Sequence, residues 1–386
     1  IDGQKIIITF DKIAPDALLT FTQFAPVPKS EFEGIDPLQV QQAPFFQHPI
    51  GCGPFMVEEV NMKNYTILAP FDKYYNGVAD FKIQLLPSAG DSDPNVVTHA
   101  KSGNLDYGYT KMVADVQALE GTPGITVTPI DVRYTRLFYL NKFDKKDGSP
   151  APLADVRVRQ ALRYAIDMET ICETLFQGSA VPANALAPDA NLKGGDLNDY
   201  NYNPEKAKEL LAEANWDPNT VIKAVYYYTD QATVDLMTAV QAYLADVGIK
   251  MEFELVEGDL ATILWAAPAD QTNGPRAVDW DICYAANAAL SLHEYYDRYR
   301  TGSPTNSHTP EDAQLNRLID ATNASADVNA QNEAFKELIK YENENLFTMA
   351  LYYQPIFLIT SDKIGDIQKG TPQFCINWDI QNWNVQ

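Results

Sequence analysis

Side chains that commonly carry out chemistry are few and scattered in this chain of 386 residues. Its four histidines, His48, His99, His293 and His308, fall in none of the spacings typical of metal ligands, and His293 is interpreted as a solvated or hydrogen-bonded residue. Neither a G-x-S-x-G nucleophile motif nor a phosphate-binding P-loop is present. We therefore predict no catalytic residues, no bound metal and no cofactor, and expect a protein that is not an enzyme.

The four cysteines are Cys52, Cys172, Cys283 and Cys375, and none of them forms a C-x-x-C pair. That spacing argues against a zinc site and against a redox motif. Because they lie in apolar segments, we expect them to be buried small hydrophobic residues. A disulfide cannot be inferred from the sequence.

Tyrosines are more informative, since three of them end a predicted strand at Tyr226, Tyr227 and Tyr228. Strand alternation sends the first and third to one face and the second to the other. Ligands of α/β proteins lie beyond the carboxyl ends of strands, where this cluster falls. The alternative, at roughly even odds, is ordinary packing of aromatic side chains in a sheet.

The elements around these tyrosines alternate between strand and helix. Residues 155–178 show the apolar period of one amphipathic helix. Farther on, a strand over 222–229, a helix over 232–247 and a strand over 249–256 form a β-α-β unit, which implies a parallel pair of strands. The sequence therefore predicts the α/β class.

Composition excludes several other functions. The 29 basic and 52 acidic residues give a net charge of −23, which disfavours nucleic acid and anionic membrane surfaces as partners. The apolar runs are too short for a membrane-spanning helix. The opening residues, IDGQKIIITF, alternate like a strand and carry no signal peptide.

Six segments, taken together and in order, resemble a known family. They are Gly51–Phe55, Ala100–Asp106, Tyr134–Asn141, Asp155–Pro188, Asn203–Leu211 and Leu351–Pro355. The resemblance is to the family 5 extracellular solute-binding proteins, the dipeptide- and oligopeptide-binding subunits of ABC importers. Cys52 stands where that family usually has threonine. The chain starts inside the family's usual sequence, so we expect an N-terminal portion with the export signal to be missing.

The resemblance implies a two-lobed, periplasmic-binding-protein-like fold of type II. Residues 1–140 would form an N-terminally incomplete first lobe, residues 141–351 an inserted second lobe, and residues 352–386 a return to the first. Hinge closure would occur near 134–141 and 351–358. The implied protein is a monomer, either extracellular, periplasmic or anchored to the cell surface as a lipoprotein.

The implied function is capture of a small solute, peptide-like or oligosaccharide, and its delivery to the permease subunits of an ABC transporter. Two alternatives stay open: a secreted hydrolase acting on glycans, suggested by acidity and aromatic content, and a module that senses a solute and passes on a signal.

Six residues are expected to line or border the ligand cleft, although any of them could instead be core. They are Tyr227, Tyr228, Trp265, Tyr284, Asn287 and Tyr353. By resemblance, Asn287 stands where peptide-binding members place the aspartate that pairs with a peptide's ammonium group. An amide cannot offset desolvation of that charge. Asp281 and Glu294 are the nearest acids that could substitute. We therefore predict a ligand that is not a dipeptide held by its free amino terminus, and a neutral oligosaccharide would fit.

Overall fold

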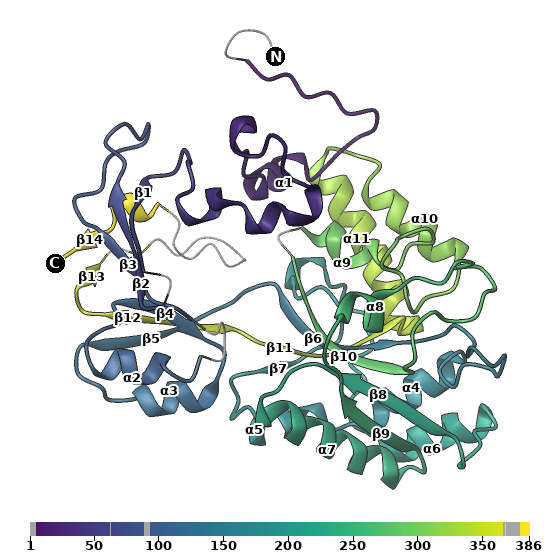
Figure 1. Cartoon of the computed structure of the whole chain (residues 1–386). Helices are drawn as coiled ribbons and strands as arrows, with labels where there is room; N and C mark the ends of the chain where they lie inside the picture. The colour runs from purple at the N-terminus through teal and green to yellow at the C-terminus, as the bar shows by residue number, and fades with distance from the viewer. Residues whose placement is uncertain (1–4, 62, 89–92, 290, 366, 368–378) are drawn as a thin grey trace. The chain divides into compact units, whose positions relative to one another are not determined.

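The computed structural model describes residues 5–61, 63–88, 93–289, 291–365, 367 and 379–386 (Figure 1). The chain divides into two compact units. The larger contains the residues up to Leu19 together with Arg133–Gln354, and the smaller contains Thr20–Val132 and Pro355–Gln386. The assignment of lobes with boundaries at 140 and 352 stays a prediction. Both strands on which those boundaries fall lie in the larger unit.

A six-stranded sheet with the order β7-β11-β6-β10-β8-β9 forms the centre of the larger unit. Its strands are β6 (Tyr134–Leu140), β7 (Val181–Pro182), β8 (Val221–Tyr226), β9 (Lys250–Leu255), β10 (Ile282–Ala288) and β11 (Thr348–Tyr353). Strands β10, β8 and β9 are parallel, whereas β6 runs antiparallel to both β10 and β11. The predicted β-α-β unit is confirmed, because α7 (Gln231–Asp246) connects the parallel strands β8 and β9.

Helices cover both faces of this sheet and bury a separate core on each (Figure 1). One core uses α4 (Val156–Ala165), α5 (Met168–Thr174), α6 (Pro204–Glu213) and α7. The other uses α8 (Leu260–Trp265), α9 (Leu292–Asp297), α10 (Ala313–Thr322) and α11 (Val328–Asn345). Strand β6 supplies Phe138 and Leu140 to the first core and Leu137 and Tyr139 to the second. This two-period alternation confirms the α/β class.

The single helix predicted over 155–178 is wrong, because the structure has two helices, α4 and α5. Ile166 adopts an extended backbone, and the side chain of Asp167 accepts a hydrogen bond from the Thr170 amide. An aspartate in this position caps a new helix and competes with continuation of the old one. Asp155 caps α4 in the same way, through the Arg157 amide.

The smaller unit contains short sheets and helices. Its strands are β1 (Phe55–Asn61), β2 (Tyr65–Pro70), β3 (Ile83–Leu85), β4 (Tyr107–Thr110), β5 (Ile125–Ile130), β12 (Ile356–Ser361), β13 (Ile364–Gly365) and β14 (Asn384–Val385). They pair as β1-β2-β3, β4-β12-β5 and β13-β14. Helices α2 (Val96–Lys101) and α3 (Val113–Leu119) pack against the second of these sheets. Helix α1 (Ala17–Gln23) spans the point where the chain passes between units.

Two further expectations are corrected. Residues 6–10 form no strand, and their apolar side chains are exposed. Cys172 and Cys283 are buried as predicted, but Cys52 is exposed, because it lies in an irregular segment rather than in a strand or helix. Cys375 lies outside the described residues.

The two edges of the six-stranded sheet differ from its centre. Strand β7 has only two residues, and one of them is Pro182. At the other edge, Lys250, Glu252 and Glu254 of β9 are exposed and alternate with Met251 and Phe253.

Candidate functional site

The candidate site lies in the larger unit, where the parallel strands β8 and β10 reach their carboxyl ends. Because β6 is antiparallel to β10, its first residues lie beside that end, with Tyr134 opposite Ala288 and Arg136 opposite Ala286. On its other side, Arg136 is paired with Tyr352 of β11. The chain thus brings a cation to the carboxyl ends of the parallel strands, which is where ligands of α/β proteins usually bind.

Arg136 is surrounded by tyrosine rings. Its guanidinium carbon lies 4.2 Å from the centre of the Tyr228 ring, 5.2 Å from that of Tyr134 and 5.7 Å from that of Tyr284. Its Nε and Nη1 atoms are buried and have no hydrogen-bond partner in the described part of the chain. Guanidinium is always protonated in proteins, so a full positive charge lies here against the faces of three aromatic rings.

The surrounding phenols are neutral. Burial raises the pKa of Tyr228 and of Tyr284, and it raises that of Tyr352 strongly. None of them is therefore a phenolate that could neutralise Arg136. Asp230, which caps α7 just after these tyrosines, directs its carboxylate to the amide and hydroxyl of Thr233.

Tyrosine hydroxyl groups at this end of the strands form hydrogen-bonded pairs. The hydroxyl oxygens of Tyr284 and Tyr352 are 2.7 Å apart, and those of Tyr227 and Tyr228 are 3.0 Å apart. Each phenol has one proton to donate, so within a pair one proton is used and the other stays available. Phe176 packs on Tyr352 with ring centres 4.5 Å apart. The site therefore combines one charged donor with spare hydroxyl donors, an arrangement suited to an oxygen anion.

The structure brings three of the six predicted residues to this site. Tyr228 and Tyr284 contact Arg136, and Tyr227 is joined through its hydroxyl group. Tyr226 and Tyr228 pack with one core and Tyr227 with the other, which confirms the predicted alternation. Tyr284 is only 1% exposed, so its ring is buried beneath the guanidinium contacts at this site.

The other three predicted residues contact members of the opposite core. Trp265 packs edge-on against Tyr139, with ring centres 5.0 Å apart. Buried Asn287 donates from Nδ2 to the Tyr295 carbonyl over 3.4 Å. The Tyr353 hydroxyl donates to the Ala185 carbonyl over 2.6 Å. None of these three contacts Arg136 among the described interactions, and their role in a cleft stays a prediction.

A second polar group surrounds Tyr353. Its hydroxyl accepts a hydrogen bond of 2.7 Å from Lys193 Nζ, and burial lowers the pKa of that lysine to about 8. Arg133 is bound by Asp189, with Nη2 and Oδ1 2.8 Å apart. These cations already have protein partners, whereas Nε and Nη1 of Arg136 have none among the described residues.

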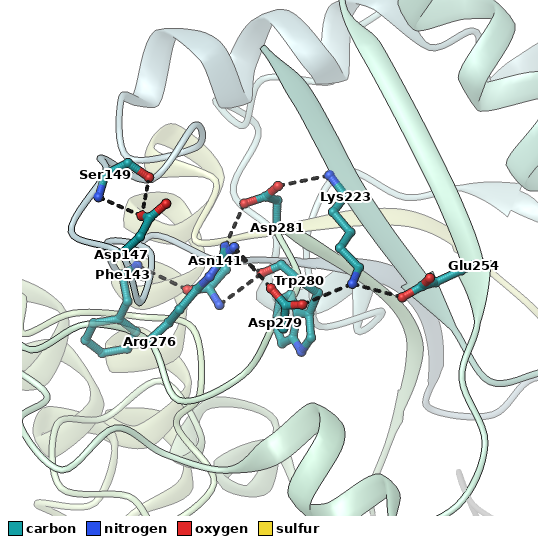
Figure 2. A network of polar contacts seen from close by, with 10 residues as sticks. All are labelled: Asn141, Phe143, Asp147, Ser149, Lys223, Glu254, Arg276, Asp279, Trp280 and Asp281. Atoms are coloured by element: carbon teal, nitrogen blue, oxygen red, sulfur yellow. Dashed lines mark hydrogen bonds and ion pairs between the residues drawn. The ribbon is translucent and has the colours of Figure 1, made fainter.

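Asp281 is not available to a ligand. Its Oδ1 lies 2.7 Å from Nη1 of Arg276, and its Oδ2 accepts from the Lys223 amide over 2.9 Å (Figure 2). Figure 2 also shows Asn141 donating to the Trp280 carbonyl and Lys223 reaching Asp279. This network joins Lys223 of β8 to residues that follow β6 or precede β10, at the end of these strands opposite to Arg136. Glu294, the other substitute acid, is an exposed residue of α9.

A pocket of about 280 Å³ in the larger unit is less suited to a ligand. It is lined by Lys142, Arg159 and Phe347, among other residues. Lys142 donates to the carbonyl oxygens of Leu140 and Phe347, and Arg159 donates to four backbone carbonyls. Their donors are therefore already used within the fold.

Sequence reasoning missed Arg136. The available signal was a single charge within YTRLFYLN, a segment that otherwise has the pattern of a buried strand. Across the described ranges, we find no group of three or more His, Cys, Asp or Glu side chains placed to bind a metal. In those same ranges no helix combines the length and the apolar character that crossing a membrane requires.

Comparison with known proteins places this geometry in a family. Residues 1–309 match the profile of the bacterial extracellular solute-binding proteins, family 5. The chain belongs to this family. Its members act outside the cytoplasm as solute-binding proteins, as the family's description states.

Individual relatives agree with this family assignment. A Brucella ovis protein whose name places it among ABC transporter peptide-binding proteins is 28% identical over 256 residues, which cover 65% of this chain and 47% of that protein. The oligopeptide-binding protein AppA of Bacillus subtilis is 26% identical over 272 residues, covering 65% and 46%. The chain thus spans about half the length of the curated relatives it matches.

Solved structures share the fold. The ABC transporter substrate-binding protein CtaP of Listeria monocytogenes superposes with a TM-score of 0.80 at 20% identity, over 98% of this chain and 75% of that one. AppA of B. subtilis, solved in complex with a nonapeptide, gives 0.69 at 19% identity over 93% and 72%. The predicted two-lobed α/β fold class of family 5 is therefore confirmed.

Proposed function

We propose that this protein is the extracellular solute-binding component of an ABC-type importer, which captures a small solute and delivers it to the permease subunits. The observation that carries the proposal is the family match over residues 1–309. The arginine and tyrosine site at the carboxyl edge of the sheet supports it, because it offers binding groups and no nucleophile or general base. Relatives named as peptide-binding proteins favour a peptide-like solute, and an oligosaccharide is kept as the second class.

The proposed mechanism is hinge closure of two lobes on the solute. The chain passes between its compact units at Leu19–Thr20, Val132–Arg133 and Gln354–Pro355. The last two crossings adjoin β6 and β11, the strands that carry Arg136 and its neighbour Tyr352. We propose that the larger unit is the inserted lobe, that the protein works as a monomer, and that it is held at the cell surface by a lipid anchor or released outside the membrane.

The test combines binding with turnover. Thermal shift of the purified protein against panels of peptides and oligosaccharides should raise the unfolding midpoint for a few related compounds. Mass spectrometry of the same mixtures should show every compound unchanged. Conversion of a glycan into shorter products would instead support the secreted hydrolase.

The importer and the sensor are separated in cells. Uptake of the labelled solute should be lost when the gene is deleted and restored when it is returned. Normal uptake combined with a lost transcriptional response to the solute would favour the sensing module over the importer.

A further inference from the structure

Among the described residues of the larger unit, Arg136 is a partly buried cation with two buried nitrogens, Nε and Nη1, that have no hydrogen-bond partner. Arg276 is neutralised by Asp281, and Lys142, Arg159 and Arg163 donate to backbone carbonyls. Buried polar atoms almost always have partners, and an unsatisfied one is destabilising. The two unpartnered nitrogens of Arg136 therefore require an explanation that the fold itself does not supply.

We propose that Arg136 is the anchoring residue for a carboxylate of the captured solute, an inference that rests on the proposed solute-binding function. Tyr134, Tyr228 and Tyr284 form the aromatic frame around it. A guanidinium presents donors in a planar fork that matches a carboxylate in two parallel hydrogen bonds. The carboxylate of the ligand would thus provide the negative charge that no described protein side chain provides for Arg136.

The surroundings of Arg136 favour a carboxylate over a neutral oxygen group. The phenols of Tyr228, Tyr284 and Tyr352 have raised pKa values and are neutral donors, so they repel no anion, and one hydroxyl proton in each tyrosine pair is free to donate. A charge-assisted hydrogen bond is roughly twice as strong as a neutral one. A neutral sugar hydroxyl placed here would leave the guanidinium charge uncompensated.

This inference changes the predicted specificity. Asn287 argues against recognition of an amino terminus, and Arg136 argues for recognition of an acid group at the other end of the solute. Two sources of carboxylate fit equally: the carboxyl terminus of a short peptide and an acidic sugar. Neutral oligosaccharides, by contrast, do not fit.

The experiment uses calorimetry on the purified protein with matched probes. The peptide set is alanylphenylalanine, its N-acetyl derivative and its carboxyl-terminal amide. The sugar set is cellobiose and cellobiouronic acid. We expect at least one carboxylate compound to bind about 10- to 100-fold more tightly than its amide or neutral counterpart, with N-acetylation having little effect.

Substitution of Arg136 assigns that preference to one side chain. Arg136→Gln should abolish the difference between carboxylate and amide, and Arg136→Lys should keep part of it, because the charge remains while the planar fork is lost. The matched control is Arg300→Gln, which removes an equal charge from an exposed pair with Asp320 and should leave the preference unchanged.

A structural role for Arg136 makes different predictions. If the side chain only packed the fold, Arg136→Met would lower the unfolding midpoint of the ligand-free protein, and Arg136→Lys would leave the carboxylate preference intact. We expect instead that Arg136→Met leaves the midpoint unchanged or raises it, because an uncompensated buried charge is removed.

The outcomes separate this inference from the function on which it rests. Binding of neutral members as tightly as acidic ones, or an unchanged preference in Arg136→Gln, would overturn the role of Arg136 while leaving solute binding in place. If the unaltered protein bound no probe and carried no co-purified solute detectable by mass spectrometry, the proposed function itself would fail, and this inference with it.

Discussion

The buried ion pair between Arg276 and Asp281 offers a direct test of how the larger unit is held together. Arg276 has 4% of its side chain exposed and Asp281 has 1%, and the two charged atoms are 2.7 Å apart. The change Asp281→Asn keeps the shape of the side chain and an oxygen for the Lys223 amide, but it removes the negative charge. The buried guanidinium then keeps only the longer contact with exposed Asp279, whose Oδ1 lies 3.8 Å from Nη2.

The size of the effect follows from this burial. Breaking a buried pair by removing one partner typically costs about 3–5 kcal/mol, because the remaining charge is still desolvated. For a unit of this size, 1 kcal/mol corresponds to about 2–4 °C in unfolding midpoint. We therefore expect Asp281→Asn to lower the midpoint by roughly 6–20 °C.

Urea denaturation followed by circular dichroism would measure the loss. The exposed pair between Arg300 and Asp320 is the control, and Asp320→Asn should cost less than about 1 kcal/mol. The double change Arg276→Met with Asp281→Leu should recover most of the stability, because no charge is left buried. A single variant within about 1 kcal/mol of the unaltered protein, or a double variant no better than the single one, would refute the reasoning.

Three further predictions follow from other contacts. Burial raises the pKa of Glu342 to about 8, so the contribution of this residue to the free energy of unfolding should be largest below its ordinary pKa of 4.5 and should be lost as pH rises through 8; Glu342→Gln should flatten that decline in denaturation curves, and parallel curves would contradict it. Asn343 donates to the Asn184 and Asn198 carbonyls and accepts from the Asn198 amide, so Asn343→Ala should cost about 2 kcal/mol or more in urea unfolding; a cost near zero would mean that water replaces these bonds. Because an amide at Asn287 provides no counterion for an ammonium group, calorimetry should show similar affinity for free and N-acetylated dipeptides; submicromolar binding that N-acetylation abolishes would disprove this.

Helix boundaries could be predicted where a capping residue lies at the point at which the apolar helical period begins or ends. Helix α6 starts at Pro204 after the Asn203 cap, and α7 ends just before Gly248, both within a residue or two of the pattern. The same apolar period runs through 155–178, yet Asp167 divides it. Periodicity reports which face is buried, whereas one side-chain hydrogen bond decides where a helix is interrupted.

The candidate site was only partly accessible to sequence reasoning. The tyrosines after β8 could be identified, because the end of a strand before a helix is a local pattern. The importance of Arg136 could not, since it depends on the absence of a partner among residues distant in sequence. Asp281 shows the converse case. It was considered as a substitute acid for a ligand, and its engagement by Arg276 and by the Lys223 amide becomes visible only when the strands are assembled.

The composition of β7 and β9 has a consequence for association between copies of the chain. A sheet edge with free backbone groups can template pairing with another strand and lead to aggregation. Here one edge offers only two residues, including Pro182, which has no amide hydrogen to share. The other edge carries Lys250, Glu252 and Glu254 as charged gatekeepers. The six-stranded sheet should therefore resist edge-to-edge pairing between copies of the folded chain, because its hydrogen-bonded ladder ends at these two strands.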